Sequence, residues 1–183
     1  MSPSTAALAH ASQSNSSMVN SSSSKSAKPP IHELDRIDRQ LLRLLQHDGR
    51  QAVSELARAV HLTTTPCYER VKRLERDGYI QGYTALICPE RLGLPLVAFV
   101  EVTIDRTSPE VFQSFQSTVE SFDEVVECSM VAGNFDYLLK IRVADIAAYR
   151  RFLGVRLATT PGLTQTRTYM VMEQVKCTRR LPV

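Results

Sequence analysis

A run of hydroxyl and cationic side chains occupies residues 64–76 of this 183-residue chain. It opens with Thr64, Thr65 and Pro66 and continues with Tyr68, Glu69, Arg70, Lys72, Arg73 and Arg76. On a helix, the hydroxyl and guanidinium groups of such a run can touch base edges in a DNA major groove, while Arg and Lys bind phosphates and fix the register. These residue types therefore indicate recognition of double-stranded DNA.

Acidic neighbours leave a second interpretation of this run open. Glu69, Glu75 and Asp77 offset part of its positive charge, so the run also fits a surface helix whose charges only keep the protein in solution. The whole chain carries 22 basic and 19 acidic side chains, a formal charge of +3, which is too mild to decide the question. The elements around the run have to decide it.

The flanking sequence predicts a helix-turn-helix. Apolar residues at helical spacing indicate a first helix that begins near Leu34 and ends at Asp48–Gly49. Ser54 is placed to cap a short second helix, and Thr63 to cap a third. Pro66 then falls in the first turn of the third helix, where a missing N–H is harmless. Three helices with a tight turn between the second and the third are typical of DNA-binding domains.

A strand or wing is expected directly after the third helix. Gly78 ends that helix, and residues 79–87 are rich in β-forming side chains. Cys88–Pro89 then interrupts the pattern and begins a linker whose far side is marked by Pro95. The first domain is therefore expected to be a winged helix-turn-helix domain that covers residues 34–95.

The second half of the chain alternates strand and helix patterns. Ser108 opens one predicted helix, and Asp145 caps another whose apolar residues, Ile146 among them, are expected to face inward. The four predicted strands are 96–104, 125–131, 135–143 and 163–175. The resulting order, βαββαβ, is that of the split ferredoxin-like motif. We therefore expect a second domain over residues 96–183, and an α+β fold class for the whole chain.

Composition sets limits outside these elements. Residues 1–30, rich in Ser, are expected to form a disordered tail. The four cysteines stand far apart, which favours isolated thiols in a reducing compartment over a metal site or a disulfide framework. No apolar stretch approaches the roughly 20 residues of a membrane span, and no secretory leader is evident. The protein is therefore expected in the cytoplasm, without a membrane partner.

Short motifs recur along residues 34–183. They are Leu-Asp-Arg-Ile-Asp at 34–38, Asp-Gly-Arg at 48–50, Thr-Pro-Cys at 65–67, Arg-Val-Lys-Arg-Leu-Glu at 70–75, Ile-Gln-Gly-Tyr-Thr-Ala at 80–85, Gly-Asn-Phe-Asp-Tyr-Leu-Leu at 133–139, Pro-Gly at 161–162, Thr-Arg-Thr-Tyr at 166–169 and Val-Met-Glu at 171–173. In this order, and with almost no insertions, they resemble the leucine-responsive regulatory protein (Lrp/AsnC) family of bacterial and archaeal transcription factors. The likeness is greatest to the leucine-responsive global regulators.

The resemblance implies a sequence-specific DNA-binding regulator of amino-acid metabolism genes, active in the bacterial cytoplasm at the nucleoid. The family's DNA-binding positions fall on residues 53–72, and the third helix is expected to enter the major groove. Together with the cations that follow, the expected DNA contacts are Val53, Ser54, Thr63, Thr64, Thr65, Pro66, Tyr68, Glu69, Arg70, Lys72, Arg73 and Arg76. The second domain would be ACT-like and would assemble homodimers into octamers or larger particles.

The resemblance also implies a pocket for an amino-acid effector, such as leucine, between ACT-like domains of neighbouring dimers. Its positions carry over to Gly133, Asn134, Phe135, Asp136, Ile146, Tyr169, Met170 and Val171. Backbone N–H groups of the glycine turn would bind the ligand's carboxylate, and Asp136 its ammonium group. Many relatives have Asp where this chain has Asn134, a departure expected to alter ligand preference or assembly. Taken alone, these residues also fit a plain hairpin turn and a core strand.

Two other function classes were weighed against DNA binding. An enzyme, or an allosteric subunit of one, needs convergent catalytic groups, yet none of the histidines is paired with a candidate nucleophile. They are His10, His32, His47 and His61, all in the tail or the first domain. The chain also lacks a phosphate-binding loop and metal-ligand spacing, so neither catalysis nor a metal cofactor is expected. An oligomeric scaffold without DNA binding would leave the helix-turn-helix unexplained.

Overall fold

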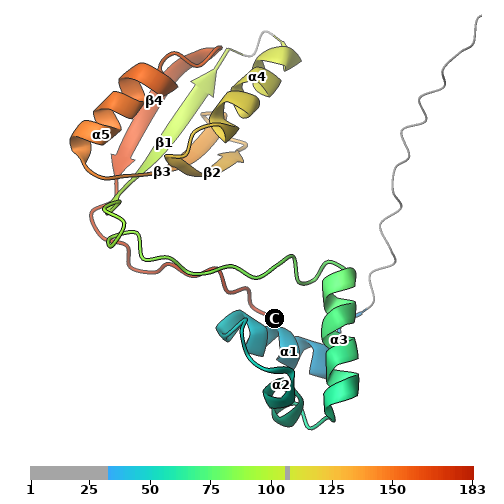
Figure 1. Ribbon diagram of the computed structural model, residues 1–183. Coiled ribbons are helices and arrows are strands. Elements are labelled where there is room, and N and C mark those ends of the chain that lie inside the picture. The colour runs from blue at the N-terminus through green and yellow to red at the C-terminus, as the bar shows by residue number, and fades with distance from the viewer. Residues whose placement is uncertain (1–32, 106–107) are drawn as a thin grey trace, which may run out of the picture. The chain divides into compact units, whose positions relative to one another are not determined.

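The computed structural model describes residues 33–105 and 108–183, so the predicted Ser-rich tail lies outside the described part of the chain (Figure 1). These residues form two compact units. One contains the described residues up to Leu42 together with Ala52–Gln81, and the other contains Arg43–Gln51 and Gly82–Val183. No helix in the described ranges is long and apolar enough to cross a membrane.

Three helices form the predicted helix-turn-helix: α1 (Arg36–His47), α2 (Val53–Ala59) and α3 (Thr64–Arg76). Their buried side chains form a small apolar core that consists of Leu41, Leu42, Leu56, Ala57, Val60, Cys67, Val71 and Leu74. Thr63 is the N-cap of α3 as predicted, although its side chain makes no capping hydrogen bond. The predicted cap of α2 is wrong, because that helix already begins at Val53, with Ala52 as its N-cap, and Ser54 lies inside its first turn.

The tight turn between α2 and α3 is a Schellman motif. The N–H of Leu62 donates to the carbonyl of Ala57, and the N–H of His61 donates to that of Arg58. This geometry requires a left-handed residue, and His61 adopts it with φ of 56°. The chain therefore changes direction sharply between α2 and α3, and one face of α3 is exposed to solvent.

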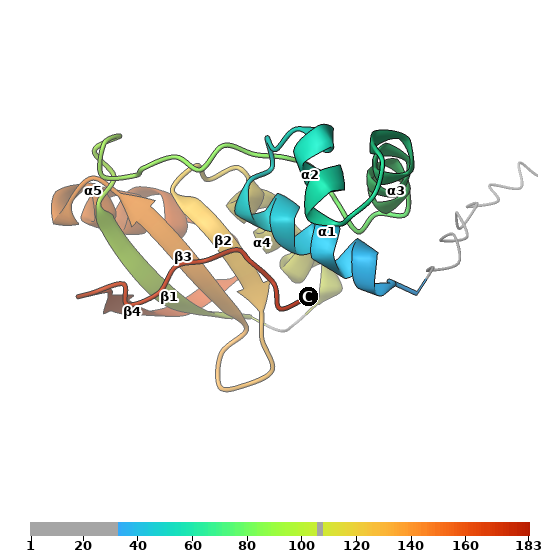
Figure 2. The same ribbon diagram turned by 90° about the horizontal axis from the view of Figure 1, so that it is seen from below.

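The second unit has the predicted βαββαβ order. Strands β1 (Leu96–Ile104), β2 (Val125–Met130), β3 (Tyr137–Val143) and β4 (Leu163–Met170) form one sheet in the order β2-β3-β1-β4, with every pair antiparallel. Two helical segments connect them: α4 (Pro109–Glu120), and α5 (Ile146–Arg151) with its π-helical continuation η1 (Phe152–Leu157). Both lie on the same face of the sheet (Figures 1 and 2).

The core of this unit lies between the sheet and the two helices. Alternate residues of the central strands, such as Val100 and Leu139, point into it and meet Phe115 of α4 and Phe152 of η1. Among the described residues, no helix or strand of this unit covers the other face of the sheet (Figure 2). Phe99, which alternates with the buried Ala98 and Val100, is half-buried on that face. The unit therefore has one closed face and one open face.

Three predictions about elements are wrong. Residues 79–88 contain no strand, so the expected wing does not form within the single chain. Strand β4 ends at Met170, not at 175, because its pairing with β1 ends there. Ile146, expected to face the core, is 61% exposed at the start of α5.

Candidate nucleic-acid interface and ligand-binding residues

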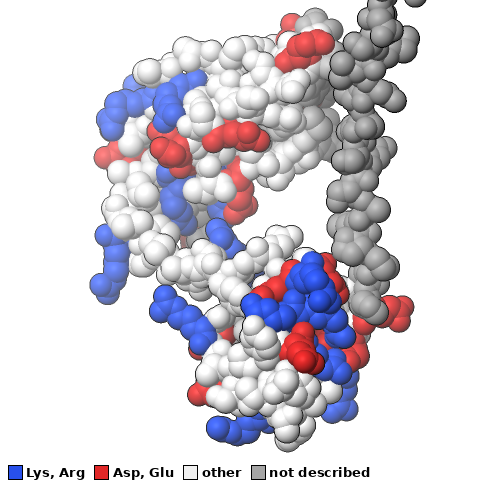
Figure 3. All heavy atoms as spheres, turned by 45° about the vertical axis from the view of Figure 1, so that its right-hand side comes forward, with Lys and Arg blue, Asp and Glu red and all other residues white. Residues whose placement is uncertain are grey.

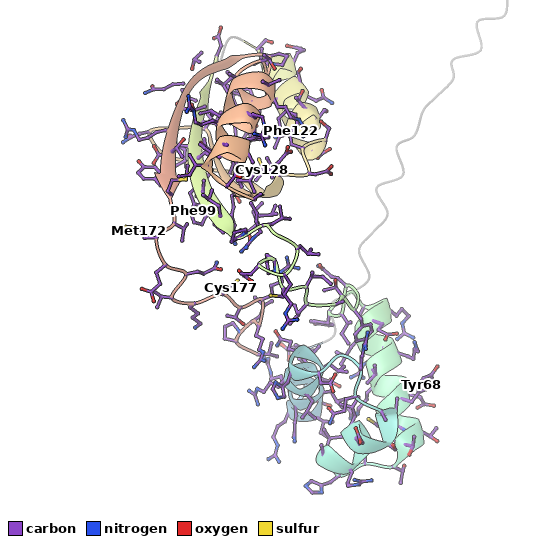
Figure 4. All side chains as sticks on the ribbon, turned by 60° about the vertical axis from the view of Figure 1, so that its left-hand side comes forward. Tyr68, Phe99, Phe122, Cys128, Met172 and Cys177 are labelled. Carbon is purple, nitrogen blue, oxygen red and sulfur yellow. The ribbon has the colours of Figure 1, made fainter. Side chains whose placement is uncertain are left out.

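One face of α3 is directed to solvent. The helix buries the stripe that contains Cys67, Val71 and Leu74. Tyr68, 49% exposed, projects away from the other two helices (Figure 4). The predicted DNA contacts exposed together with it are Thr64, Thr65, Glu69, Lys72 and Arg76. The structure therefore brings most of the α3 residues predicted to contact DNA onto one free surface.

The exposed cations of this surface lie beside acidic and aromatic side chains. Lys72 Nζ lies 2.7 Å from a carboxylate oxygen of Glu75 and 5.7 Å from the ring centroid of Tyr68. Arg76 Nε lies 3.4 Å from Asp77 Oδ1, and its side chain is 73% exposed. In both pairs the cation is the exposed partner, with its Lys72 or Arg76 side chain 53% or 73% exposed, so solvent and salt reach it and a phosphate can bind it.

Arg70 and Arg73 have a different environment, because both are bound by carboxylates at the start of α1. Arg70 Nη1 donates to Asp38 Oδ1 at 2.9 Å and to Asp35 Oδ2 at 2.5 Å. Arg73 Nη2 donates to Asp38 Oδ2 at 2.6 Å. Asp38 itself is 1% exposed. We call these four residues the Asp–Arg cluster; in Figure 3, Lys and Arg gather beside Asp and Glu on the first unit.

The same two acids also fix the start of α1. Asp35 Oδ1 accepts the N–H of Asp38 at 2.7 Å, and the N–H of Asp35 donates to Asp38 Oδ2 at 3.3 Å, a reciprocal capping box. Burial alone would raise the pKa of Asp35, but the N–H of Asp38 and the guanidinium of Arg70 hold this pKa below its ordinary value. Sequence reasoning missed both acids, although their i, i+3 spacing before an apolar helix was the signal.

The remaining predicted DNA contacts lie at the starts of α2 and α3. Val53 and Ser54 lie at the start of α2, the first half-buried and the second exposed. Thr63 is exposed just before α3, whereas Pro66 is half-buried in its first turn. Thr63 and Pro66 therefore flank the head of α3, whereas Val53 and Ser54 lie at the end of α2 away from the turn.

The predicted effector residues lie in two separate places. Gly133 and Asn134 are exposed between β2 and β3, and Phe135 is half-buried beside them. Asp136 follows and is 5% exposed, and its Oδ2 accepts the backbone N–H of Ile104 at 2.9 Å. This carboxylate therefore has a structural partner at the end of β1.

The other predicted effector residues lie at the opposite end of β1. Met170 pairs with Ala98, and the N–H of Val171 donates to the carbonyl of Val97. Ile146 follows the end of β3, whose last residue, Val143, pairs with Leu96. The N–H of Asp136, by contrast, donates to Val102. Five residues of strand span roughly 16 Å, so one chain does not gather these two groups into one pocket.

Two cavities of the second unit contain none of these effector residues. One, of about 340 Å³, lies between α4 and β2 and includes Gln116 and Cys128. Another, of about 390 Å³, lies beside α5 and includes Arg151 and Phe152. All four cysteines are free thiols; Cys67 is buried, whereas Cys88, Cys128 and Cys177 are exposed, not buried or half-buried as predicted.

Comparison with protein families gives two matches. Residues 34–75 match the AsnC-type helix-turn-helix domain, and residues 97–181 match the Lrp/AsnC ligand binding domain. The leucine-responsive regulatory protein of Escherichia coli K12 is 52% identical over 158 residues, which are 86% of this chain and 96% of that protein. The protein of the same name from Klebsiella pneumoniae is 53% identical over the same shares.

Solved structures agree with these matches. A transcriptional regulator from Neisseria meningitidis, in complex with L-methionine, has a TM-score of 0.79 and 34% identity, and the match covers 82% of this chain and 97% of that one. A feast or famine regulatory protein from M. tuberculosis, complexed with L-methionine, has a TM-score of 0.74 and 38% identity and covers 81% and 99%. The similar proteins are regulators and not enzymes, which removes the enzyme alternative.

Proposed function

The chain belongs to the Lrp/AsnC family and is a DNA-binding transcriptional regulator, and on that premise we propose that the exposed face of α3 reads the major groove of its target DNA. The observation that carries the proposal is the free face itself. Hydroxyl, phenol and cationic groups lie on it, opposite the buried stripe. It acts at the nucleoid as a consequence of this binding.

Roles on this surface follow from residue chemistry. Thr64 and Thr65, at the head of α3, contact base edges, because the N-terminal part of a recognition helix lies deepest in the groove. Lys72 and Arg76 bind phosphates on either side, and Glu69 accepts from a cytosine amino group where the sequence provides one. Ser54, exposed at the start of α2, contacts a phosphate of the DNA backbone.

A change at Thr65 tests this assignment. Thr65→Leu should lower affinity for the protein's own promoter region by about ten-fold to a hundred-fold, because a lost base contact costs about 1–3 kcal/mol. Affinity for random duplex should change little. Thr65→Ser, which keeps the hydroxyl, is the matched control and should retain most of the discrimination. Equal weakening of Thr65→Leu on both duplexes, measured by fluorescence anisotropy, would show that Thr65 only positions the helix.

The effector that we propose is an amino acid, because two similar proteins were solved with L-methionine and the curated relatives are leucine-responsive. The exposed turn at Gly133–Asn134 offers backbone N–H groups for a carboxylate. Tyr169 and Met170, 46% and 41% exposed, offer apolar surface for a side chain. These groups lie at opposite ends of β1, so a complete site needs a turn from one copy and a β4 end from another.

Titration calorimetry with leucine, methionine, alanine and lysine identifies the effector. Asn134→Asp, which adds a carboxylate to this exposed turn, should change the order of preference among the four ligands without changing the fold. Gln113→Glu on the exposed side of α4 adds the same charge elsewhere in the unit and serves as the control. Identical ligand affinities in all three proteins would place the site away from this turn.

The proposed assembly is a homodimer that associates further, up to an octamer or larger. Its support is the open face of the sheet, where Phe99 pairs across strands with Tyr169 and Lys140. Beyond the sheet, Leu86 and Ile87 of the linker are 86% and 62% exposed in a segment without pairing. A second copy would cover this apolar surface and supply the missing half of the ligand site.

A further inference from the structure

The four cations of α3 divide into two pairs with opposite environments. Lys72 and Arg76 form ion pairs with Glu75 and Asp77, acids of their own helix and its C-cap. Arg70 and Arg73 cross to α1 and bind Asp35 and Asp38, two charges against two. The Asp–Arg cluster is therefore neutral as a whole and includes a buried acid, whereas the side chains of Lys72 and Arg76 are exposed to solvent.

Resting on the proposed function of α3, we propose that Asp38 is a specificity-determining positioning residue, which holds Arg70 and Arg73 in place of DNA phosphates. Its carboxylate offers the two arginines what a phosphate would offer: anionic oxygens that accept charge-assisted hydrogen bonds. Held in this way, the arginines fix the angle of α3 and add little to sequence-independent affinity. Discrimination is then left to the contacts at the head of the helix.

Burial explains why the arginines stay with Asp38. Asp38 is 1% exposed. If Arg73 bound a phosphate instead, the buried carboxylate of Asp38 would lose one of its two cations, which costs free energy. One oxygen of Asp38 also accepts the N–H of Asp35 in the capping box, which ties the carboxylate to the start of α1. Exchange for a phosphate is therefore costly for Arg70 and Arg73.

Position explains why the restraint matters for DNA. Arg73 lies on the border of the exposed face, and its side chain is 32% exposed, compared with 53% for Lys72. Without Asp38, this guanidinium would be free to turn toward a phosphate of any sequence. Each phosphate contact adds about 0.9 to the slope of log affinity against log salt, whatever the sequence.

The salt dependence of binding to random duplex DNA tests the proposal. Lys72→Gln should reduce the magnitude of the slope by about one unit, because it removes a phosphate ligand. Arg73→Gln, the matched variant one residue along, should leave the slope unchanged. Asp38→Asn should increase the slope by about one to two units and lower the ratio of promoter to random affinity. A merely structural role for Asp38 would weaken both affinities without increasing any slope.

The outcomes separate this inference from the proposed function. If Arg73→Gln reduces the slope as much as Lys72→Gln does, Arg73 binds phosphate and the inference is wrong, although α3 still binds DNA. If Lys72→Gln has no effect either, the assignment of α3 itself fails. All measurements are made well below each variant's unfolding temperature, monitored by circular dichroism. Should Asp38→Asn fail to fold, the comparison of Arg73→Gln with Lys72→Gln still decides.

Discussion

At the scale of single residues, the carboxylate of Asp136 has a structural role that differs from the predicted one. The family resemblance, together with its place after a glycine turn, assigned it to a ligand's ammonium group. In the structure it accepts the N–H of Ile104 and is nearly enclosed. The difference arises because the burial of Asp136 depends on which strand lies beside the turn. The residues of the turn itself do not determine that strand or its register. The exposed neighbours Gly133 and Asn134 remain where the sequence suggested.

Removal of this carboxylate should therefore destabilise the protein in the absence of any ligand. Asp136→Ala leaves the N–H of Ile104 unsatisfied in a buried place, which costs about 1–3 kcal/mol. Asp136→Asn keeps an acceptor oxygen and should lose less. Urea denaturation of the ligand-free proteins measures both. An Asp136→Ala protein as stable as the wild type would free the carboxylate for a role in ligand binding alone.

Asp35 should make the stability of the first unit depend on acid pH. Its pKa in the folded state lies below the ordinary value of 3.8, because the N–H of Asp38 and Arg70 outweigh the opposing effect of burial. A lowered folded pKa contributes stability above the ordinary pKa, and that stability is lost as pH falls through the folded pKa. Asp35→Asn should therefore flatten the fall in unfolding temperature below about pH 4. Parallel curves for the two proteins from pH 7 to pH 3 would contradict this.

At the scale of elements, periodicity predicted most of the fold. The bounds of β1 and the start of α4 follow directly from apolar spacing and from Ser108 before Pro109. Two elements failed for a shared reason: a strand needs a partner. Residues 79–88 have β-forming side chains but no neighbouring strand. Strand β1 begins at Leu96, so the last residues of the predicted strand 163–175 have no β1 residues beside them. The β-propensity of a segment describes only how well its side chains suit a strand. Whether the segment forms one depends on whether the fold places a partner strand beside it.

Gly162 should be essential for the join between α5–η1 and β4. Its φ is +79°, and a Cβ there would lie 2.2 Å from Val111 Cγ1 of α4. Gly162→Ala adds left-handed strain of about 1–2 kcal/mol and overpacking of about 1–3 kcal/mol. Gly93→Ala is the matched control, since φ there is +72° with open space around the Cβ. Thermal denaturation should show the larger loss for Gly162→Ala; equal losses would mean that Val111 moves aside without cost.

At the scale of the whole molecule, the open sheet face should govern assembly. Phe99→Glu places a charge in the middle of the face proposed to meet a second copy, and a buried unpaired charge is costly. The dimer dissociation constant should rise at least ten-fold, about 1.4 kcal/mol. Analytical ultracentrifugation measures it, with Gln113→Glu on the exposed side of α4 as the charge-matched control. An unchanged association constant would place the dimer contact elsewhere.

The Asp–Arg cluster also bears on how fast the regulator finds its target. A genome offers about 10⁶–10⁹ competing sites, and each cation bound to a phosphate lengthens the stay on every one of them. With Arg70 and Arg73 bound to Asp35 and Asp38, two cations of α3 are withheld from this competition. The residence time on random DNA is then shorter, and sliding and hopping between sites are quicker. The carboxylates of Asp35 and Asp38 would thus increase the rate at which the regulator finds its target site.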